Sequence, residues 1–183
     1  MKELSAKELV ALLLEEIENK KSTIACIGSS LRSDDAAALK LCDILRKRTS
    51  SDEILICDGG LENCLDRLIE KKPSRLVILD AAAVDTNEAG KIFLFDIEEI
   101  SEGAAWSHRI PISMALKILS NSILLDSVIL IGIGGERFDI GEELSPSVEK
   151  LINYVDELLG IRMKTMLELE FSSYESKDKN RDG

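Results

Sequence analysis

The sequence predicts an α/β fold in three layers, an α/β/α sandwich built on a mostly parallel, twisted sheet of about five strands. Four apolar runs carry this prediction, at residues 23–28, 53–60, 75–80 and 127–135, because strands buried on both faces lack the alternation of half-exposed strands. Helical patterns separate most of these runs, which favours crossover connections with helices on both faces. The length of 183 residues and the hydrophobic fraction of 45% fit one domain with a real core.

The first predicted element is an amphipathic helix at residues 5–20. Ser5 and Glu8 have the spacing of a capping box, in which the two side chains satisfy backbone N–H groups of the first turn. One apolar stripe runs along this helix, formed by Leu9, Leu12, Leu13 and Ile17. We therefore expect this helix to pack against the core.

Two further helices alternate with the first three strands. The strand at 23–28 is followed by a helix whose apolar face has helical spacing and consists of Ala38, Leu41, Cys42 and Leu45. The strand at 53–60 ends in two glycines, and the next helix, from residue 61, is ended by Pro73. The third strand, 75–80, is apolar up to its terminal aspartate. This order of elements predicts parallel neighbours in the sheet.

In the second half of the chain, the sequence predicts one strand that runs antiparallel to its neighbour in the sheet. Residues 90–100 alternate more, and the loop before them is too short for a crossover helix, so we expect an antiparallel edge strand. Residues 111–121 form a helix with Pro111 in its first turn, and 127–135 form the last buried strand.

A closing helix completes the predicted domain. Ser145 is its expected N-cap, Pro146 occupies the first helical position, and Gly160 is the expected end. The polar sequence that follows loses helical periodicity, so we expect a flexible tail after a single α/β domain of residues 1–163. The N-terminal helix, the core and the tail are then residues 5–20, 22–160 and 164–183.

The charge of the chain argues against two classes of partner. Its 34 acidic and 23 basic residues give a net charge of -11, which repels nucleic acid and anionic lipid. No apolar span approaches the ~20 residues of a transmembrane helix, and the N-terminus lacks the pattern of a signal peptide. We expect a cytoplasmic protein that binds neither nucleic acid nor membrane.

The four cysteines do not form a recognisable metal or disulfide pattern. Their spacings of 16, 15 and 7 include no CxxC pair. Three of them lie in apolar runs or on an apolar helix face, as small buried hydrophobic residues often do. Buried, reduced thiols are therefore the expectation.

Acidic residues gather where the predicted parallel strands end, which is where open α/β sheets bind ligands. Asp34 and Asp35 stand at a helix start and Asp58 in a glycine turn, where capping and turn roles are ordinary. Asp80 ends an apolar strand, where a carboxylate is costly to bury without a partner. His108, the one histidine in the chain, lies in a predicted loop. Two carboxylates and an imidazole form a plausible partial shell for nickel, zinc or iron.

Nucleotide binding is disfavoured at the loop after the first strand. A dinucleotide fingerprint needs G-x-G-x-x-G, whereas this loop reads C-I-G-S-S-L, and no P-loop is present. Carboxylates at this position would also repel a pyrophosphate.

Five short motifs follow one another through residues 22–160. Residues 26–38 contain C-I-G-S and the acidic pair of Asp34 and Asp35, and the later motifs are CDGG at 57–60, LVILDA at 76–81, SHRIPIS at 107–113 and LSPSVEKLI at 144–152. This ordered set resembles the signature of the [NiFe]-hydrogenase maturation endopeptidases. That family has G-x-G-N and an acidic pair in the first loop, then a D-G-G turn, a strand ending in D-A, a loop histidine and a helix start of the form L-[ST]-P-x-V.

The resemblance implies an enzyme, an aspartic-type endopeptidase of the cytoplasm. The metal-contacting and catalytic residues of that family correspond to Asp35, Asp80 and His108 in this sequence. It implies no cofactor of the enzyme's own: nickel arrives with the substrate, the precursor of a hydrogenase large subunit, which loses a short C-terminal peptide. Nickel or cadmium could occupy the same site in a crystal, and we expect a monomer.

The chain departs from the family signature at Cys26, Ser29, Ala36 and Ala38. The two alanines favour helix where the family has glycine, whereas Ser29 replaces the signature asparagine beside the expected substrate. A non-catalytic hydrogenase assembly or metal-binding factor is therefore one alternative. A small-molecule binding or hydrolytic domain is another, because a fold alone does not determine function. The sequence leaves open whether the metal polarises the peptide carbonyl or an aspartate acts as general base.

Overall fold

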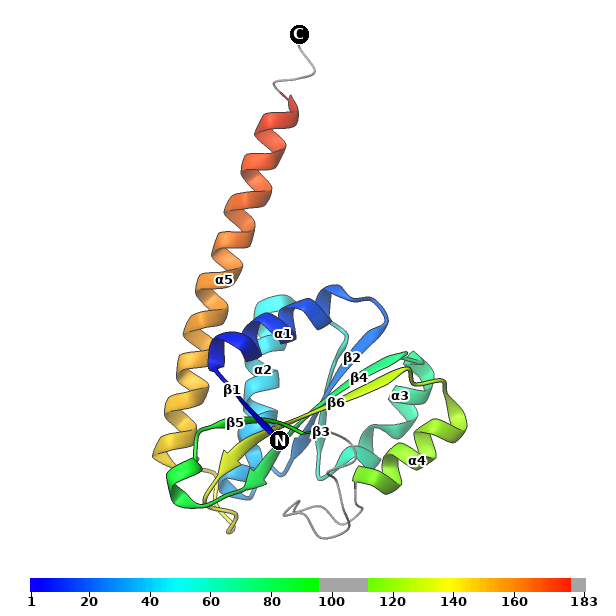
Figure 1. Cartoon of the computed structure of the whole chain (residues 1–183), viewed down its shortest axis with the longest axis vertical. Helices are drawn as coiled ribbons and strands as arrows, with labels where there is room; N and C mark the ends of the chain where they lie inside the picture. The colour runs from blue at the N-terminus through cyan, green and yellow to red at the C-terminus, as the bar shows by residue number, and fades with distance from the viewer. Residues whose placement is uncertain (96–111, 179–183) are drawn as a thin grey trace.

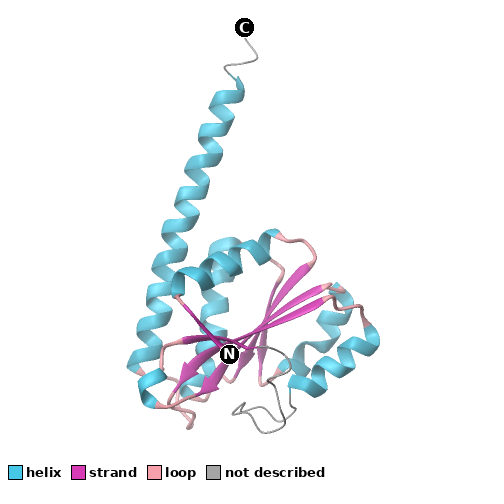
Figure 2. Ribbon diagram, viewed as in Figure 1, coloured by secondary structure: helices cyan, strands magenta, loops and turns pink. Residues whose placement is uncertain are grey.

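The computed structural model describes residues 1–95 and 112–178, and they form a six-stranded sheet with helices on both faces (Figures 1 and 2). The strand order is β1-β5-β6-β4-β2-β3. The strands are β1 (Lys2–Leu4), β2 (Ser22–Gly28), β3 (Ile54–Asp58), β4 (Arg75–Ala83), β5 (Ile92–Phe95) and β6 (Ser127–Gly135). Strands β3, β2, β4 and β6 run parallel, and β5 is antiparallel to β6. The predicted fold class is confirmed.

The short strand β1 was not predicted from the sequence. It pairs antiparallel with β5, with Lys2 opposite Leu94 and Leu4 opposite Ile92. It therefore adds a sixth strand outside the predicted antiparallel strand. Three residues are too few to show a periodic pattern, so only this pairing identifies the strand.

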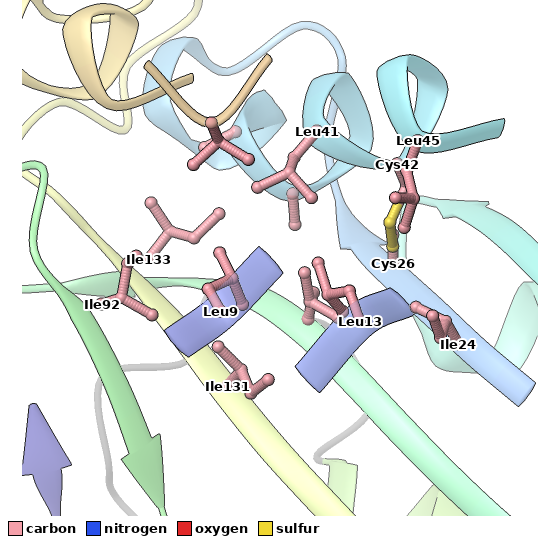
Figure 3. Close-up of a cluster of buried hydrophobic side chains, with 14 of the residues drawn as sticks. Leu9, Leu13, Ile24, Cys26, Leu41, Cys42, Leu45, Ile92, Ile131 and Ile133 are labelled. Carbon is pink, nitrogen blue, oxygen red and sulfur yellow. A yellow bond between two sulfur atoms is a disulfide. The ribbon is translucent and has the colours of Figure 1, made fainter. Parts of the chain in front are cut away.

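The helices divide between the two faces of the sheet and bury two apolar clusters. Helices α1 (Ala6–Glu18), α2 (Ala37–Thr49) and α5 (Pro146–Asp178) cover one face, and α3 (Leu65–Lys71) and α4 (Ile112–Ser122) cover the other. Figure 3 shows the first cluster, in which Leu9 and Leu13 of α1 meet Leu41 of α2 and Ile131 of β6. In the second cluster Leu119 of α4 packs with strand residues such as Leu76 and Ile78.

Helix α1 is fixed at both ends by polar contacts. The backbone N–H of Ser5 donates to the Glu8 carboxylate over 2.8 Å, and the Glu8 N–H donates to the Ser5 hydroxyl, which confirms the capping box. The Ser5 backbone N–H also holds the pKa of Glu8 below its usual value. At the other end the buried Glu16 carboxylate accepts from the Ser22 hydroxyl over 2.7 Å and pairs with Arg75 over 2.9 Å.

The predicted end of the closing helix at Gly160 is wrong, because α5 continues to Asp178 and projects beyond the sheet (Figure 1). Gly160 lies inside the helix, where an added Cβ would come 3.2 Å from the Arg48 guanidinium. Arg48 in turn binds Asp156 over 2.6 Å, and that carboxylate raises the pKa of Arg48. The glycine therefore gives room to an arginine and does not stop the helix. The flexibility expected for residues 164–183 stays a prediction.

The prediction of reduced cysteines is wrong in this structure, which has two disulfides. Cys26 of β2 pairs with Cys42 of α2 (Figure 3), and Cys57 of β3 pairs with Cys64. The paired Cα atoms are 6.3 and 5.6 Å apart, distances that the fold creates and that linear spacing does not reveal.

Reduction of these two disulfides is expected to lower the melting temperature by about 10–20 °C. Each bridge removes entropy from the unfolded chain, worth about 2–3 kcal/mol for loops of this length, and ~1 kcal/mol corresponds to a shift of about 2–4 °C in a chain of this size. Thermal unfolding with and without a phosphine reductant measures the shift. A variant with all four cysteines replaced by serine should have the same melting temperature in both conditions. Equal melting temperatures, together with alkylation of four thiols without reductant, would show that the bridges do not form.

Candidate active site at the carboxyl edge of the sheet

The candidate site lies where the strand order reverses. The chain continues from β2 to β3 on one side, whereas β4 pairs with the other side of β2, and such a switch point is the usual ligand crevice of an open α/β sheet. A short turn of helix, η1 (Ser33–Ala36), follows β2 and packs against β4. This contact brings the segment of Asp35 against the strand of Asp80.

Asp35 and Asp80 are both almost fully buried, at 1% and 0% exposure. The Asp80 carboxyl group accepts the N–H of Ala81 over 2.8 Å. Strand β4 was predicted to end at Asp80 but continues to Ala83, because the three alanines that follow pair with β6 as far as Gly135. Asp80 therefore lies within a strand. Alternation along β4 places it on the face of Leu76 and Ile78, which α3 and α4 cover.

Gly28 is what allows η1 to fold back over the end of β2. A Cβ atom at Gly28 would lie 1.9 Å from the backbone oxygen of Asp35, an impossible distance for any other residue. The same oxygen accepts the N–H of Ser29 over 3.3 Å, and the N–H of Asp35 donates to Arg32 over 3.0 Å. The backbone of Asp35 is thereby held directly beside the end of β2.

The helix-cap prediction for Asp34 is wrong. No side chain caps η1 or α2, and the fully buried Asp34 carboxylate accepts three N–H groups from distant residues. These bonds come from Glu136 over 2.9 Å, Arg137 over 3.0 Å and Ser145 over 2.6 Å. Asp34 therefore ties the loop after β6, and the start of α5, to the loop after β2.

Backbone bonds continue this connection between the two loops. Ser33 donates to the Gly141 oxygen over 2.7 Å, and Gly141 donates to the Leu31 oxygen over 3.0 Å. The side chain of Arg32 also donates to the Phe138 oxygen over 3.1 Å. The loops of residues 29–36, which include Asp35, and 136–145 therefore form one connected platform.

Asp58 does more than occupy a turn. Its exposed carboxylate accepts from the backbone N–H of Ser30 over 3.2 Å and from the Ser30 hydroxyl over 2.7 Å. Gly59 adds a backbone bond to the Gly28 oxygen over 2.7 Å. The turn after β3 thus supports the loop that leads to Asp35, a role that its position in the sequence did not reveal.

His108, the third predicted site residue, lies outside the described residues. Within 1–95 and 112–178, no three His, Cys, Asp or Glu side chains are grouped so that they could hold a metal ion. Asp35 and Asp80 offer carboxylate oxygens, which bind cations and can accept a proton from water. The chemistry available at this edge is therefore that of two buried acids at the switch point of the strand order.

Comparison with known proteins decides the family. A sequence model described as hydrogenase maturation protease, HycI, matches residues 39–160, well over half of the chain. The chain belongs to the hydrogenase maturation protease family. The matched stretch includes Asp80 and the position of His108 and begins four residues after Asp35. The chain is accordingly a protease, as the resemblance predicts.

A protein of Methanocaldococcus jannaschii, named as a candidate hydrogenase maturation protease, is 29% identical over 161 residues, which are 81% of this chain and 94% of that protein. The [NiFe] hydrogenase maturation protease HycI of Thermococcus kodakarensis superimposes with a TM-score of 0.62 at 23% identity, over 81% of this chain and 99% of its own. The endopeptidase HycI of Escherichia coli follows with a TM-score of 0.59 at 24% identity, over 76% and 89%. These structures share the fold of this protease.

In the part of the chain that the structure describes, no helix is both long enough and apolar enough to cross a bilayer.

Proposed function

We propose that this protease removes the C-terminal peptide from the large-subunit precursor of a [NiFe] hydrogenase after nickel has been inserted. The observation that carries the proposal is Asp80, a carboxyl group buried inside β4 with η1 packed against that strand, in a member of this protease family. The Asp80 carboxyl group accepts the Ala81 N–H and lies near the carboxyl ends of the parallel strands, where open α/β sheets bind their ligands. Asp35 lies on the packed turn and is equally buried.

Asp35, Asp80 and His108 are the residues that we assign to the nickel of the substrate. Carboxylate and imidazole groups suit a divalent metal of this kind. The enzyme then needs no cofactor of its own, because the metal that directs cleavage is part of the precursor. A precursor without nickel lacks the feature that these side chains recognise, which makes nickel insertion a condition for processing.

Cleavage is peptide hydrolysis, in which water adds its hydroxyl to the carbonyl carbon and a proton passes to the departing amine. Nickel held at the site would polarise the carbonyl, and an aspartate would take the proton from the attacking water. The two roles are compatible. We place this reaction in the cytoplasm, with a monomeric enzyme.

The test uses purified large-subunit precursor in nickel-loaded and nickel-free forms. Incubation with the protease should remove a C-terminal peptide from the loaded form, seen as a loss of intact mass, and leave the nickel-free form unchanged. Equal cleavage of both forms would contradict nickel recognition. Stable binding of the loaded form without any loss of mass would instead favour a non-catalytic assembly factor.

A further inference from the structure

Two exposed aliphatic side chains lie next to each other on the platform that includes Asp35. Leu31 is 61% exposed and Ile140 is 94% exposed. A backbone bond joins the oxygen of Leu31 to the N–H of Gly141, and the bridge between Arg32 and Gly141 is parallel, so Leu31 and Ile140 are neighbours. We call these two residues the rim pair. Large apolar side chains exposed together are typical of an interaction site.

Ile140 of the rim pair lines a hollow of about 550 Å³, and three of the seven residues that line it are acidic. Ile140 lines this hollow together with Ser33, Arg137, Asp139, Glu142 and Glu143. All three carboxylate residues are exposed. Arg137 is the one cationic residue in the lining, and its guanidinium donates to the Glu143 backbone oxygen over 3.0 Å. The surface therefore offers an apolar anchor beside an excess of negative charge.

The platform that carries this surface is rigidly joined to the candidate active site. Ser33, in the wall of the hollow, is two residues from Asp35, and the buried Asp34 between them holds the opposite loop by three hydrogen bonds. A surface that is fixed in advance loses little conformational entropy when a partner binds. Anything held by the rim pair is thereby kept at a constant position relative to Asp35.

We infer that the rim pair and the acidic hollow dock a segment of the protein substrate, a segment with apolar side chains flanked by lysine or arginine. This inference rests on the proposed function, because it assigns the substrate to the surface beside the proposed catalytic residues. Apolar burial supplies the anchor, and the carboxylates attract and orient a basic segment. The net charge of -11 makes a second copy of this chain a poorer occupant.

The test compares the Leu31→Ser/Ile140→Ser variant with the wild-type protease on nickel-loaded large-subunit precursor. The variant should raise KM about tenfold or more and leave kcat within about twofold, because docking contributes equally to the ground and transition states. Leu124→Ser is the matched control, because Leu124 is 89% exposed and lies before β6 at the opposite edge of the sheet. Glu142→Gln/Glu143→Gln should raise KM about threefold and weaken its dependence on salt.

Binding of fluorescently labelled precursor to each variant separates the docking surface from the proposed reaction. Wild-type binding without cleavage would contradict the proposed function, and a weaker affinity of the rim-pair variant would still support docking. An unchanged KM and affinity, or a change in kcat alone, would overturn the docking surface. A change only in the self-association of the chain would assign the rim pair to a second copy and likewise overturn it.

Discussion

Asp80→Asn is expected to slow cleavage of nickel-loaded precursor by about a hundredfold or more, and Asp35→Asn by a similar factor. The substitution keeps the shape of the side chain and its carbonyl oxygen, so the bond from the Ala81 N–H can persist. It removes the negative charge that attracts a metal and the basic oxygen that accepts a proton from water. Loss of a positioned acid or base typically costs about 10²–10⁴ in rate.

The comparison of KM and kcat assigns a role to each aspartate. A residue that only recognises nickel should weaken binding of the loaded precursor and so raise KM, whereas a general base should lower kcat. Asp126→Asn is the matched control, because Asp126 is exposed just before β6 at the opposite edge of the sheet. Melting curves must show that the variants fold. Folded Asp35 and Asp80 variants with wild-type processing rates would remove both residues from the site.

The architecture was predictable because strands buried on both faces of a sheet have continuous apolar sequences. The continuous apolar runs identify β2, β3, β4 and β6, and the capping box identifies the start of α1. Boundaries were less accurate where the signal is local. Asp80 resembles the polar end of a strand, yet the small residues after it continue the pairing with β6.

Features that depend on residues distant in the sequence have no such local sequence pattern. Strand β1 exists through its pairing with β5, and the disulfides exist because strands and helices bring cysteines together. At Gly160 a stop signal is overridden by the good helix formers that follow it. These elements are set by three-dimensional neighbours, which a linear pattern does not contain.

In the candidate site, too, some features were predictable from the sequence and others depend on distant partners. Asp35 and Asp80 could be predicted to share one edge, because parallel strands deliver their carboxyl ends to the same side. The roles of Asp34 and Asp58 could not, since the partners of Asp34 are 102 to 111 residues away and the Ser30 partner of Asp58 is 28 residues away. Local capping was the simplest explanation of the acidic pair. In the structure, neither aspartate side chain caps η1 or α2.

Asp34→Ala is expected to lower the free energy of unfolding by about 5 kcal/mol or more, because three hydrogen bonds to a buried charged group are worth about 1.5–3 kcal/mol each. The N–H groups of Glu136, Arg137 and Ser145 would lose their acceptor together. For a chain of this size, each ~1 kcal/mol lowers the melting temperature by about 2–4 °C. Urea and thermal unfolding measure both quantities.

Two further variants keep this prediction testable even where Asp34→Ala does not fold. Asp34→Asn retains one acceptor oxygen and turns an NH₂ group toward a backbone N–H, so an intermediate loss of about 2–3 kcal/mol is expected. Asp58→Ala also removes an acceptor of two hydrogen bonds, but at an exposed position where water replaces it, and should cost under about 1 kcal/mol. At a helix N-cap, asparagine serves as well as aspartate and alanine costs about 1 kcal/mol. An Asp34→Asn variant with unchanged stability would therefore favour the capping role, whereas a graded loss of stability from Asn to Ala would show that Asp34 holds the loops after β2 and β6 together.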